Sequence, residues 1–165
     1  MDLFILRHGE ADQRSKTTIS DTKRSLTDSG KKEVEEISKA LVKLGIKFDY
    51  VFSSPLVRAQ QTASIILKEI KCKNHENLVQ LSPEGDRSEL YNKLSLLKQD
   101  SSVLLVGHEP YLSQLVSEAI SDATNCRIDL KKAGLVRIRT VSCIPKLRGE
   151  IRWLLTPKHL KYMVN

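Results

Sequence analysis

Cysteine is scarce in this chain, with three residues among 165, namely Cys72, Cys126 and Cys143. The odd count and the wide spacing, which is not of the metal-binding type, favour reduced thiols in a cytoplasm. Long apolar runs are missing too, and none approaches the roughly 20 residues that a membrane span needs. The first apolar stretch meets charged residues at once and is too short for a signal peptide. We therefore expect a cytoplasmic protein that has no membrane partner.

Aromatic residues make up only 5% of the chain, which bears on the meaning of its net charge of +7. A basic protein can bind nucleic acid, but the lysines and arginines are spread along the chain. The densest clusters, at 68–73 and 131–132, contain no interleaved aromatic residues. We therefore expect no nucleic-acid partner, and we attribute the charge to attraction for anionic substrates.

Metal and nucleotide motifs are also missing. The four histidines have neither the paired spacing nor the nearby carboxylates of a metal site; they are His8, His75, His108 and His159. No glycine-rich phosphate loop of the nucleotide-binding kinds occurs. The sequence thus predicts no metal and no cofactor.

What is present is a regular alternation of strand-like and helix-like segments without repeats or linkers, which predicts one α/β domain over residues 1–165. Strands are expected at 2–6, 48–53, 78–81, 102–106, 134–141 and 150–155, the last two as a hairpin. Helices are expected at 27–44, after Pro55, at 87–98 and after Pro110. Apolar side chains recur on one face of each helix, as Val34, Ile37, Leu41 and Leu44 do in the first.

Three of the expected strands end in a turn that carries arginine or histidine. Arg7, His8 and Gly9 follow the first strand, Arg58 lies shortly after the second, and His108 follows the strand at 102–106. The carboxyl edge of a sheet is where open α/β folds bind their ligands. Histidine supplies a nucleophile near neutral pH, and arginine supplies a planar fork of donors suited to phosphate.

These segments, taken in order, closely resemble the motifs of the histidine phosphatase superfamily, and within it the small phosphohistidine phosphatases. The resemblance covers nearly the whole chain and is carried by Arg-His-Gly at 7–9, Arg-Ser-Leu-Thr at 24–27, Ser-Ser-Pro-Leu-Val-Arg-Ala at 53–59, Gly-His-Glu-Pro at 107–110 and the stretch at 153–160. It implies a phosphoglycerate mutase-like α/β/α sandwich of three layers. Its central sheet would be mostly parallel, with helices on both faces.

His8 is the expected nucleophile, because a neutral imidazole can attack phosphorus and give a phosphohistidine that water then hydrolyses. Its other ring nitrogen would then carry the proton and be held by an acceptor such as a backbone carbonyl. Arg7 and Arg58 are expected to clamp the equatorial phosphoryl oxygens. In the family, the histidine that matches His108 completes the phosphate pocket as a donor.

Other residues of these motifs have less specific roles. Gly9 lets the backbone turn and a ligand approach closely. Arg24 either lines the mouth of the pocket and binds substrate or anchors its loop. Thr27 is interpreted as a helix cap and Glu109 as a helix-terminal charge.

The general acid is the part of the site that the sequence defines least. Larger relatives carry a carboxylate on an inserted segment between the motifs of Arg58 and His108. Here 49 residues separate the two, at 59–107, which leaves no room for a substantial lid. Glu84 is the first candidate for the acid and Glu10 the second. A phosphoramidate substrate would fit a reduced need for an acid, because imidazole, with a pKa of about 6.5, leaves far more easily than an alkoxide.

The leading hypothesis is a metal-independent phosphatase that acts on phosphohistidine in a protein, of the phosphorelay or signalling type. One alternative is a phosphomonoesterase for small phosphorylated metabolites, and another is a non-catalytic phosphate-binding module. The expected partner is a phosphorylated protein or a small phosphate ester, and the protein is expected to be a monomer.

Overall fold

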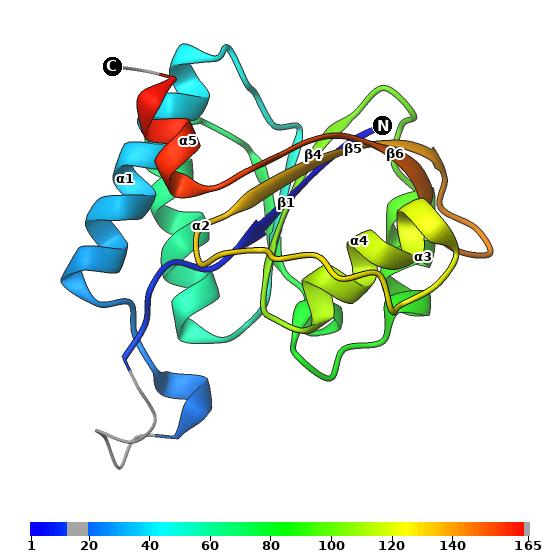
Figure 1. Cartoon of the computed structure of the whole chain (residues 1–165), viewed down its shortest axis with the longest axis horizontal. Coiled ribbons are helices and arrows are strands. Elements are labelled where there is room, and N and C mark those ends of the chain that lie inside the picture. The colour runs from blue at the N-terminus through cyan, green and yellow to red at the C-terminus, as the bar shows by residue number, and fades with distance from the viewer. Residues whose placement is uncertain (13–19, 164–165) are drawn as a thin grey trace.

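A six-stranded sheet forms the centre of the computed structural model, which describes residues 1–12 and 20–163 (Figure 1). The strand order is β3-β2-β4-β1-β5-β6, where β1 is Asp2–Arg7, β2 is Tyr50–Ser53, β3 is Asn74–Asn77, β4 is Ser102–Gly107, β5 is Leu135–Ser142 and β6 is Arg148–Leu155. The first four strands in this order run parallel, β5 is antiparallel to β1, and β6 is antiparallel to β5. The mostly parallel sheet expected from the sequence is confirmed.

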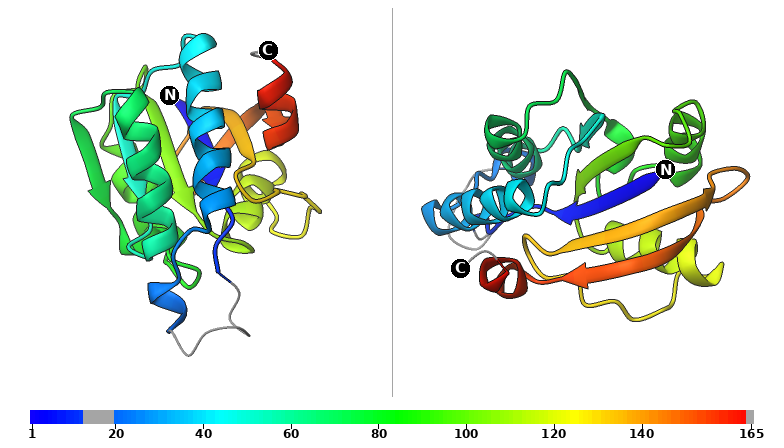
Figure 2. Two further views of the ribbon diagram at one scale, coloured as in Figure 1. Left: turned by 90° about the vertical axis from the view of Figure 1, so that its left-hand side faces the viewer. Right: turned by 90° about the horizontal axis from the view of Figure 1, so that it is seen from above.

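Helices cover both faces of the sheet, as the right-hand view of Figure 2 shows. One face carries α1 (Asp28–Lys43), α2 (Val57–Glu69) and α5 (Pro157–Tyr162), and the other carries α3 (Arg87–Ser95) and α4 (Tyr111–Ser121). Strand β1 serves both layers, because Phe4 and Leu6 pack with α1 and α2 while Leu3 and Ile5 pack with α3 and α4. Two short 3-10 helices, η2 (Asp21–Lys23) and η3 (Val79–Leu81), connect the main elements.

The helical stripes expected from the sequence are largely buried, and Leu44 and Ile120 are the exposed exceptions. Val34, Ile37 and Leu41 are fully buried, and the Thr27 side chain caps α1 by accepting the Gly30 N–H at 3.0 Å. Leu44 was expected inside but is 39% exposed, because α1 ends at Lys43 and the chain turns away at Gly45, where φ is +68°. Ile120, in the last turn of α4, is likewise 39% exposed.

The strand expected at 78–81 is wrong. The edge strand is instead the polar segment Asn74–Asn77, which pairs with β2 along one side only and whose four residues are all exposed. The apolar residues that suggested a strand belong to the 3-10 turn η3 and its flank, through which Leu78 and Leu81 reach the core beneath α3 and α4. A short apolar run satisfies burial equally well as a turn or as a strand.

From the sequence we expect reduced thiols and no membrane span. The three cysteines, all of them in the described part of the chain, are free thiols. Among residues 1–12 and 20–163, no helix has both the length and the apolar character needed to cross a membrane.

Candidate active site

Parallel pairing of β1 with β4 brings His8 and His108 together. The register sets Arg7 opposite Gly107, so each histidine is the first residue beyond its strand, and the His8 N–H donates to the Gly107 carbonyl at 3.1 Å. The two imidazole rings lie with their centroids 5.0 Å apart. His8 and His108 are 8% and 2% exposed, so the pair is almost fully shielded from solvent at the carboxyl edge of the sheet.

The first turn of α2 delivers Arg58 to the same place. Strand β2 ends at Ser53, and the helix starts at Val57, so the turn between them lies directly beside β4. Arg58 is only 3% exposed, and its Nε–H donates to Nε2 of His8 at 3.2 Å. The three residues therefore meet although 100 positions separate the first from the last.

The contacts of His8 fix its tautomer. Nδ1 lies 2.7 Å from the Gly9 carbonyl oxygen, which can only accept, so Nδ1 carries the proton. Nε2 faces the Arg58 Nε–H, which can only donate, so Nε2 presents its lone pair. The pKa of His8 is lowered to about 4, chiefly by burial, which outweighs the hydrogen bond to the Gly9 carbonyl, and also by the charges of Arg58, Arg7 and Arg24. His8 is thus a neutral imidazole at pH 7.

His108 is neutral as well. Burial is the main reason that its pKa is lowered to about 3, and the charges of His8 and Arg58 act in the same direction. Its Nε2 lies 2.8 Å from Oγ of Ser54, whereas its buried Nδ1 has no hydrogen-bond partner within the described residues. Such an atom costs free energy unless a ligand or water meets it.

The lowered pKa of His8 predicts a pH-dependent stability. Above pH 6.5 neither the folded nor the unfolded imidazole is charged, but between about pH 6.5 and 4 only the unfolded one takes up a proton, so stability falls as the pH falls. His8→Ala removes this contribution. Urea titrations at pH 7 and 4.5 should therefore show wild type losing about 2 kcal/mol more of its unfolding free energy than the variant. Equal losses in the two proteins would mean that His8 is not held neutral.

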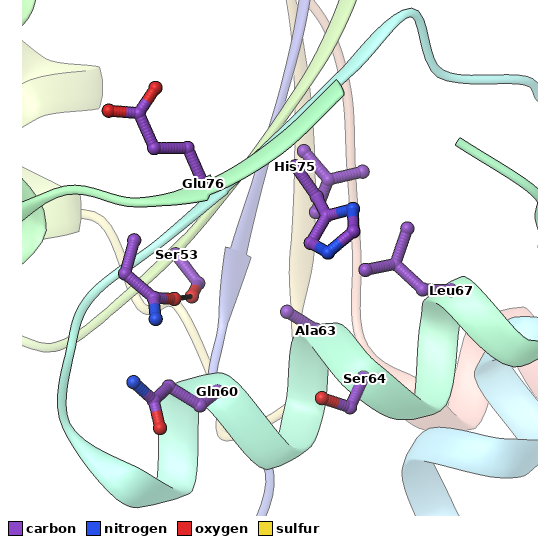
Figure 3. A pocket seen from close by; sticks show the side chains of 9 residues that line it. Ser53, Gln60, Ala63, Ser64, Leu67, His75 and Glu76 are labelled. Atoms are coloured by element: carbon purple, nitrogen blue, oxygen red, sulfur yellow. Dashed lines mark hydrogen bonds between the residues drawn. The ribbon is translucent and has the colours of Figure 1, made fainter. Parts of the chain in front are cut away.

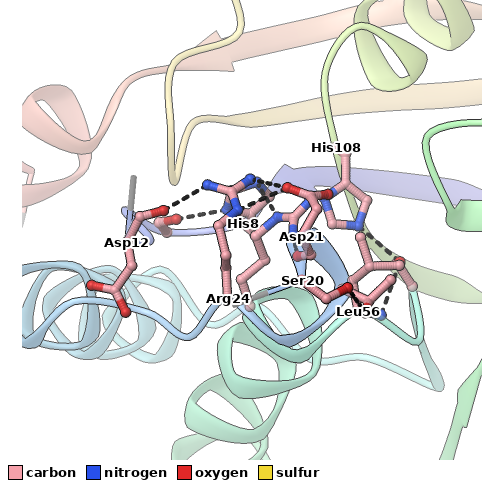
Figure 4. Close-up of polar contacts among 11 residues, drawn as sticks. His8, Asp12, Ser20, Asp21, Arg24, Leu56 and His108 are labelled. Atoms are coloured by element: carbon pink, nitrogen blue, oxygen red, sulfur yellow. Dashed lines mark hydrogen bonds and ion pairs between the residues drawn. The ribbon is translucent and has the colours of Figure 1, made fainter. Parts of the chain in front are cut away.

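Asp21 joins this cluster without having been expected from the sequence. Its carboxylate accepts from Arg58 Nη2 at 3.2 Å and from Arg24 Nε and Nη2 at 2.8 and 2.7 Å (Figure 4). Its carbonyl oxygen accepts from Arg58 Nη1 at 2.7 Å. Arg24 also donates to the carbonyl of Asp12 at 2.6 Å, so it anchors its own loop, and through Asp21 it is joined to the cluster. The only sequence signal for Asp21 was its position three residues before Arg24.

Arg7 is held differently from Arg58. Its Nη1 donates to the Leu130 carbonyl at 2.8 Å, and its buried Nε has no hydrogen-bond partner among the residues described. The structure thus puts the Arg7 charge near His8 but does not direct its fork onto the His8 ring. One buried donor of Arg7 remains available for a ligand oxygen.

Gly9 is favoured by packing, because a side chain there would crowd its neighbours. A Cβ there would lie 2.8 Å from the Val34 side chain, and the Gly9 N–H donates to Oγ1 of Thr62 at 3.1 Å. Thr62 in turn donates to the Arg58 carbonyl at 2.7 Å. Thr62, also missed in the sequence, therefore ties the loop of His8 to the helix of Arg58.

The two candidates for a general acid do not reach the histidines. Glu84 is exposed in the turn between η3 and α3 and makes no hydrogen bond or ion pair with the described residues of the cluster. Glu10 is engaged elsewhere, 3.3 Å from the Lys132 ammonium and 3.5 Å from the Thr27 hydroxyl. Glu109 accepts the Ser113 N–H at 3.1 Å, which confirms its role at the start of α4.

Beside this cluster, a hollow of about 560 Å³ is lined by four cationic residues, Arg7, Lys131, Lys132 and Lys158. Within residues 1–12 and 20–163, no group of three or more histidines, cysteines and carboxylates is placed to hold a metal ion. A separate hollow of about 250 Å³ lies between α2 and the edge strand β3, lined by residues such as Gln60, Ser64 and His75 (Figure 3). None of its nine lining residues is arginine or lysine, so it lacks the cations that would hold a phosphate dianion.

Comparison with known proteins defines the class to which this fold and site belong. The family model of the histidine phosphatase superfamily (branch 1) matches residues 3–82. An uncharacterized protein of Picosynechococcus sp. is 32% identical over 97% of this chain and 99% of its own length. Phosphohistidine phosphatase SixA of Escherichia coli (strain K12) is 30% identical over 98% of this chain and 97% of its own length. The chain belongs to the histidine phosphatase superfamily and is a hydrolase of that family.

Its particular likeness is to SixA in structure as well as in sequence. The structure of the protein histidine phosphatase SixA complexed with tungstate superposes with a TM-score of 0.83 at 27% identity, over 98% of this chain and all of that one. The phosphoglycerate mutase-like sandwich expected from the motifs is therefore confirmed.

Proposed function

We propose that this protein hydrolyses phosphohistidine on a protein, without a metal, through a phosphohistidine formed on His8. The observation that carries the proposal is the state of His8, a buried neutral imidazole whose Nδ1 proton is bound to the Gly9 carbonyl and whose Nε2 lone pair faces a guanidinium. This is the state that an imidazole nucleophile needs at neutral pH. The likeness to SixA, named as a phosphohistidine phosphatase, supports the choice of substrate.

The reaction proceeds in two transfers. In the first, Nε2 of His8 bonds to phosphorus while the bond from phosphorus to the substrate imidazole breaks, and the departing ring nitrogen takes up a proton from solvent water. In the second, a water oxygen bonds to phosphorus while the bond from phosphorus to Nε2 breaks, one water proton passes to solvent, and His8 is left as the neutral Nδ1–H tautomer. The Gly9 carbonyl holds the Nδ1 proton throughout, which stabilises the positive charge that the phosphorylated ring carries.

The surrounding donors offset the charge on the transferring group. Arg58 is the principal one, because it is 3% exposed and already directed at Nε2 of His8. The buried Nε of Arg7 and Nδ1 of His108 lack partners within the described residues. The Arg7 Nε–H can donate to a phosphoryl oxygen, and so can Nδ1 of His108 when it carries the proton. For His108 this requires the Nδ1–H tautomer, which leaves Nε2 to accept the Ser54 hydroxyl at 2.8 Å.

The proposed preference for phosphohistidine follows from the lack, among the described residues, of one placed to donate a proton to the leaving group. Glu84 and Glu10 do not contact the histidines, and Asp21 is engaged by two arginines. A site without a placed acid penalises an alkoxide leaving group far more than imidazole, whose pKa is about 6.5. Residues 59–107 separate Arg58 from His108, and they belong to α2, β3, η3, α3, β4 and the turns between them. They leave no inserted lid there to exclude a protein substrate, and we propose a phosphorylated protein as the partner of a monomeric enzyme.

We expect kcat/KM for a phosphohistidine protein to exceed that for a phosphate monoester, such as a sugar phosphate, by a factor on the order of 10² or more, because the monoester needs the missing acid. Glu84→Gln should leave the rate on phosphohistidine protein within about twofold of wild type. If Glu84 does supply a proton, the same variant should lose activity on the monoester alone. Both substrates are measured with wild type, Glu84→Gln and Glu89→Gln, the last removing a nearby exposed carboxylate from α3.

The alternative, a phosphatase for small metabolites, makes the opposite prediction. A wild-type enzyme that hydrolyses a sugar phosphate far faster than any phosphohistidine protein would establish that alternative. A protein that binds phosphate but turns over neither substrate would be a binding module.

A further inference from the structure

Asp21 binds Arg58, the arginine that the proposed mechanism assigns to the phosphoryl group. His8 and Arg58 are 8% and 3% exposed in the free protein, so a ligand can reach them only by replacing a group that now covers them. Asp21 belongs to η2, which packs against α2, and it contacts Arg58 through both its main chain and its carboxylate. Its charge also acts on His108, whose pKa it raises against the stronger effect of burial.

The geometry of the Arg58 guanidinium locates the Asp21 oxygen more closely. The Nε–H and one Nη2–H of a guanidinium point in parallel to the same side, as the fork that grips two oxygens of a phosphate. Here Nε donates to Nε2 of His8 at 3.2 Å and Nη2 donates to Oδ2 of Asp21 at 3.2 Å. Oδ2 is thus bound to the same guanidinium as the nucleophilic nitrogen, and it competes with a phosphoryl oxygen for Nη2.

We infer that the Asp21 carboxylate is an internal substitute for the phosphoryl group, which occupies the Arg58 fork in the free enzyme and gives it up when a phosphoryl group binds. This deepens the proposed function, since it concerns the same pocket, and it assigns Asp21 the task of keeping phosphate weakly bound. Product phosphate leaves readily because a tethered anion is present to take its place.

Arg24 keeps its contact with the Asp21 carboxylate during this exchange. It grips the other carboxylate oxygen, Oδ1, with Nε and Nη2 at 2.8 and 2.7 Å and is itself fastened to the Asp12 carbonyl. The Asp21 contacts with both arginines are drawn in Figure 4. Oδ2 can therefore leave Arg58 while Oδ1 stays on Arg24, so the carboxylate remains paired in both states. Arg24 therefore holds Asp21 in both states, in addition to anchoring its own loop.

The test is the affinity of the full-length protein for inorganic phosphate, measured by calorimetry at fixed ionic strength. Asp21→Asn removes the competing charge and keeps the shape, so it should bind phosphate on the order of tenfold more tightly than wild type. Asp12→Asn is the matched control, since only the Asp12 carbonyl touches Arg24, and it should bind phosphate within about twofold of wild type. Asp21→Glu keeps the charge and should bind phosphate no more tightly than wild type.

Unchanged or weaker phosphate binding by Asp21→Asn overturns the inference, and so does equal tightening by Asp21→Glu or Asp12→Asn. Should Asp21→Asn fail to fold, the wild-type protein decides the matter without a variant. Phosphate titration followed by NMR should shift the carboxyl ¹³C resonance of Asp21 and the Nε resonance of Arg58 with the same saturation curve, and a stationary Asp21 resonance contradicts exchange.

Failure of this inference is distinguishable from failure of the proposed function. Phosphate affinity that responds to Asp21 as stated, without turnover of any phosphohistidine protein, leaves the exchange standing and removes the substrate. Normal turnover of phosphohistidine protein with no response of phosphate affinity to Asp21 does the reverse.

Discussion

Replacement of His8 by alanine is expected to abolish turnover of phosphohistidine protein, with a loss on the order of 10⁴-fold or more. The imidazole is the only group in the described cluster that combines a free lone pair directed at a guanidinium with a fixed proton on its other nitrogen. The donors Arg7, Arg58 and His108 remain in the variant, but they offset charge and cannot form the covalent intermediate. Single-turnover and steady-state rates on a phosphohistidine protein measure the loss.

The control for this variant is His75→Ala, which removes an exposed imidazole from the edge strand β3 and should keep the wild-type rate. Both proteins should give the near-ultraviolet circular dichroism of wild type, since His8 contributes few apolar contacts to either core layer. A His8→Ala enzyme that turns over at the normal rate would mean that another group attacks phosphorus.

Replacement of Arg58 by lysine should be nearly as damaging as replacement by alanine, with a loss in kcat/KM on the order of 10²-fold or more for both. The guanidinium donates from three nitrogens at once, to His8 and to two oxygens of Asp21, all within 3.2 Å. A lysine ammonium keeps the charge but concentrates it at one point and cannot span these positions. Rates on phosphohistidine protein with both variants provide the measurement.

The matched substitution for this test is Arg152→Lys, at an exposed position on β6, which should leave kcat/KM unchanged. If Arg58→Lys works at close to the wild-type rate while Arg58→Ala does not, the site needs only a positive charge there, and the planar clamp is not part of catalysis.

The sequence was enough to bring four of the site residues to one edge of the sheet, because each lies just beyond an apolar run or in the first turn of the following helix. Arg7, His8 and His108 follow from the ends of β1 and β4, and Arg58 follows from the turn after β2. What the sequence did not contain was the pairing of strands. Only the register of Arg7 with Gly107 places the two imidazoles 5.0 Å apart.

The residues that sequence reasoning missed are those that act through long-range contacts. Asp21 is polar and lies in a 3-10 turn without periodicity, and its meaning comes from Arg58, 37 positions later. Thr62 reads as one more helical residue until the structure sets its hydroxyl between Gly9 and the Arg58 carbonyl. The strand at 78–81 failed for a related reason, since the ladder with β2 selects Asn74–Asn77, which sequence polarity would assign to a loop.

The central claim of the mechanism is that His8 itself takes up the phosphoryl group. Rapid quenching of the enzyme with phosphohistidine protein labelled in the phosphoryl group, followed by peptide mapping under alkaline conditions, makes this visible. We predict a transient label on the peptide that contains His8, stable to base and lost in acid, that forms and decays at rates consistent with turnover. Turnover with label on another residue, or with none on the enzyme at any time within a single turnover, would contradict the mechanism.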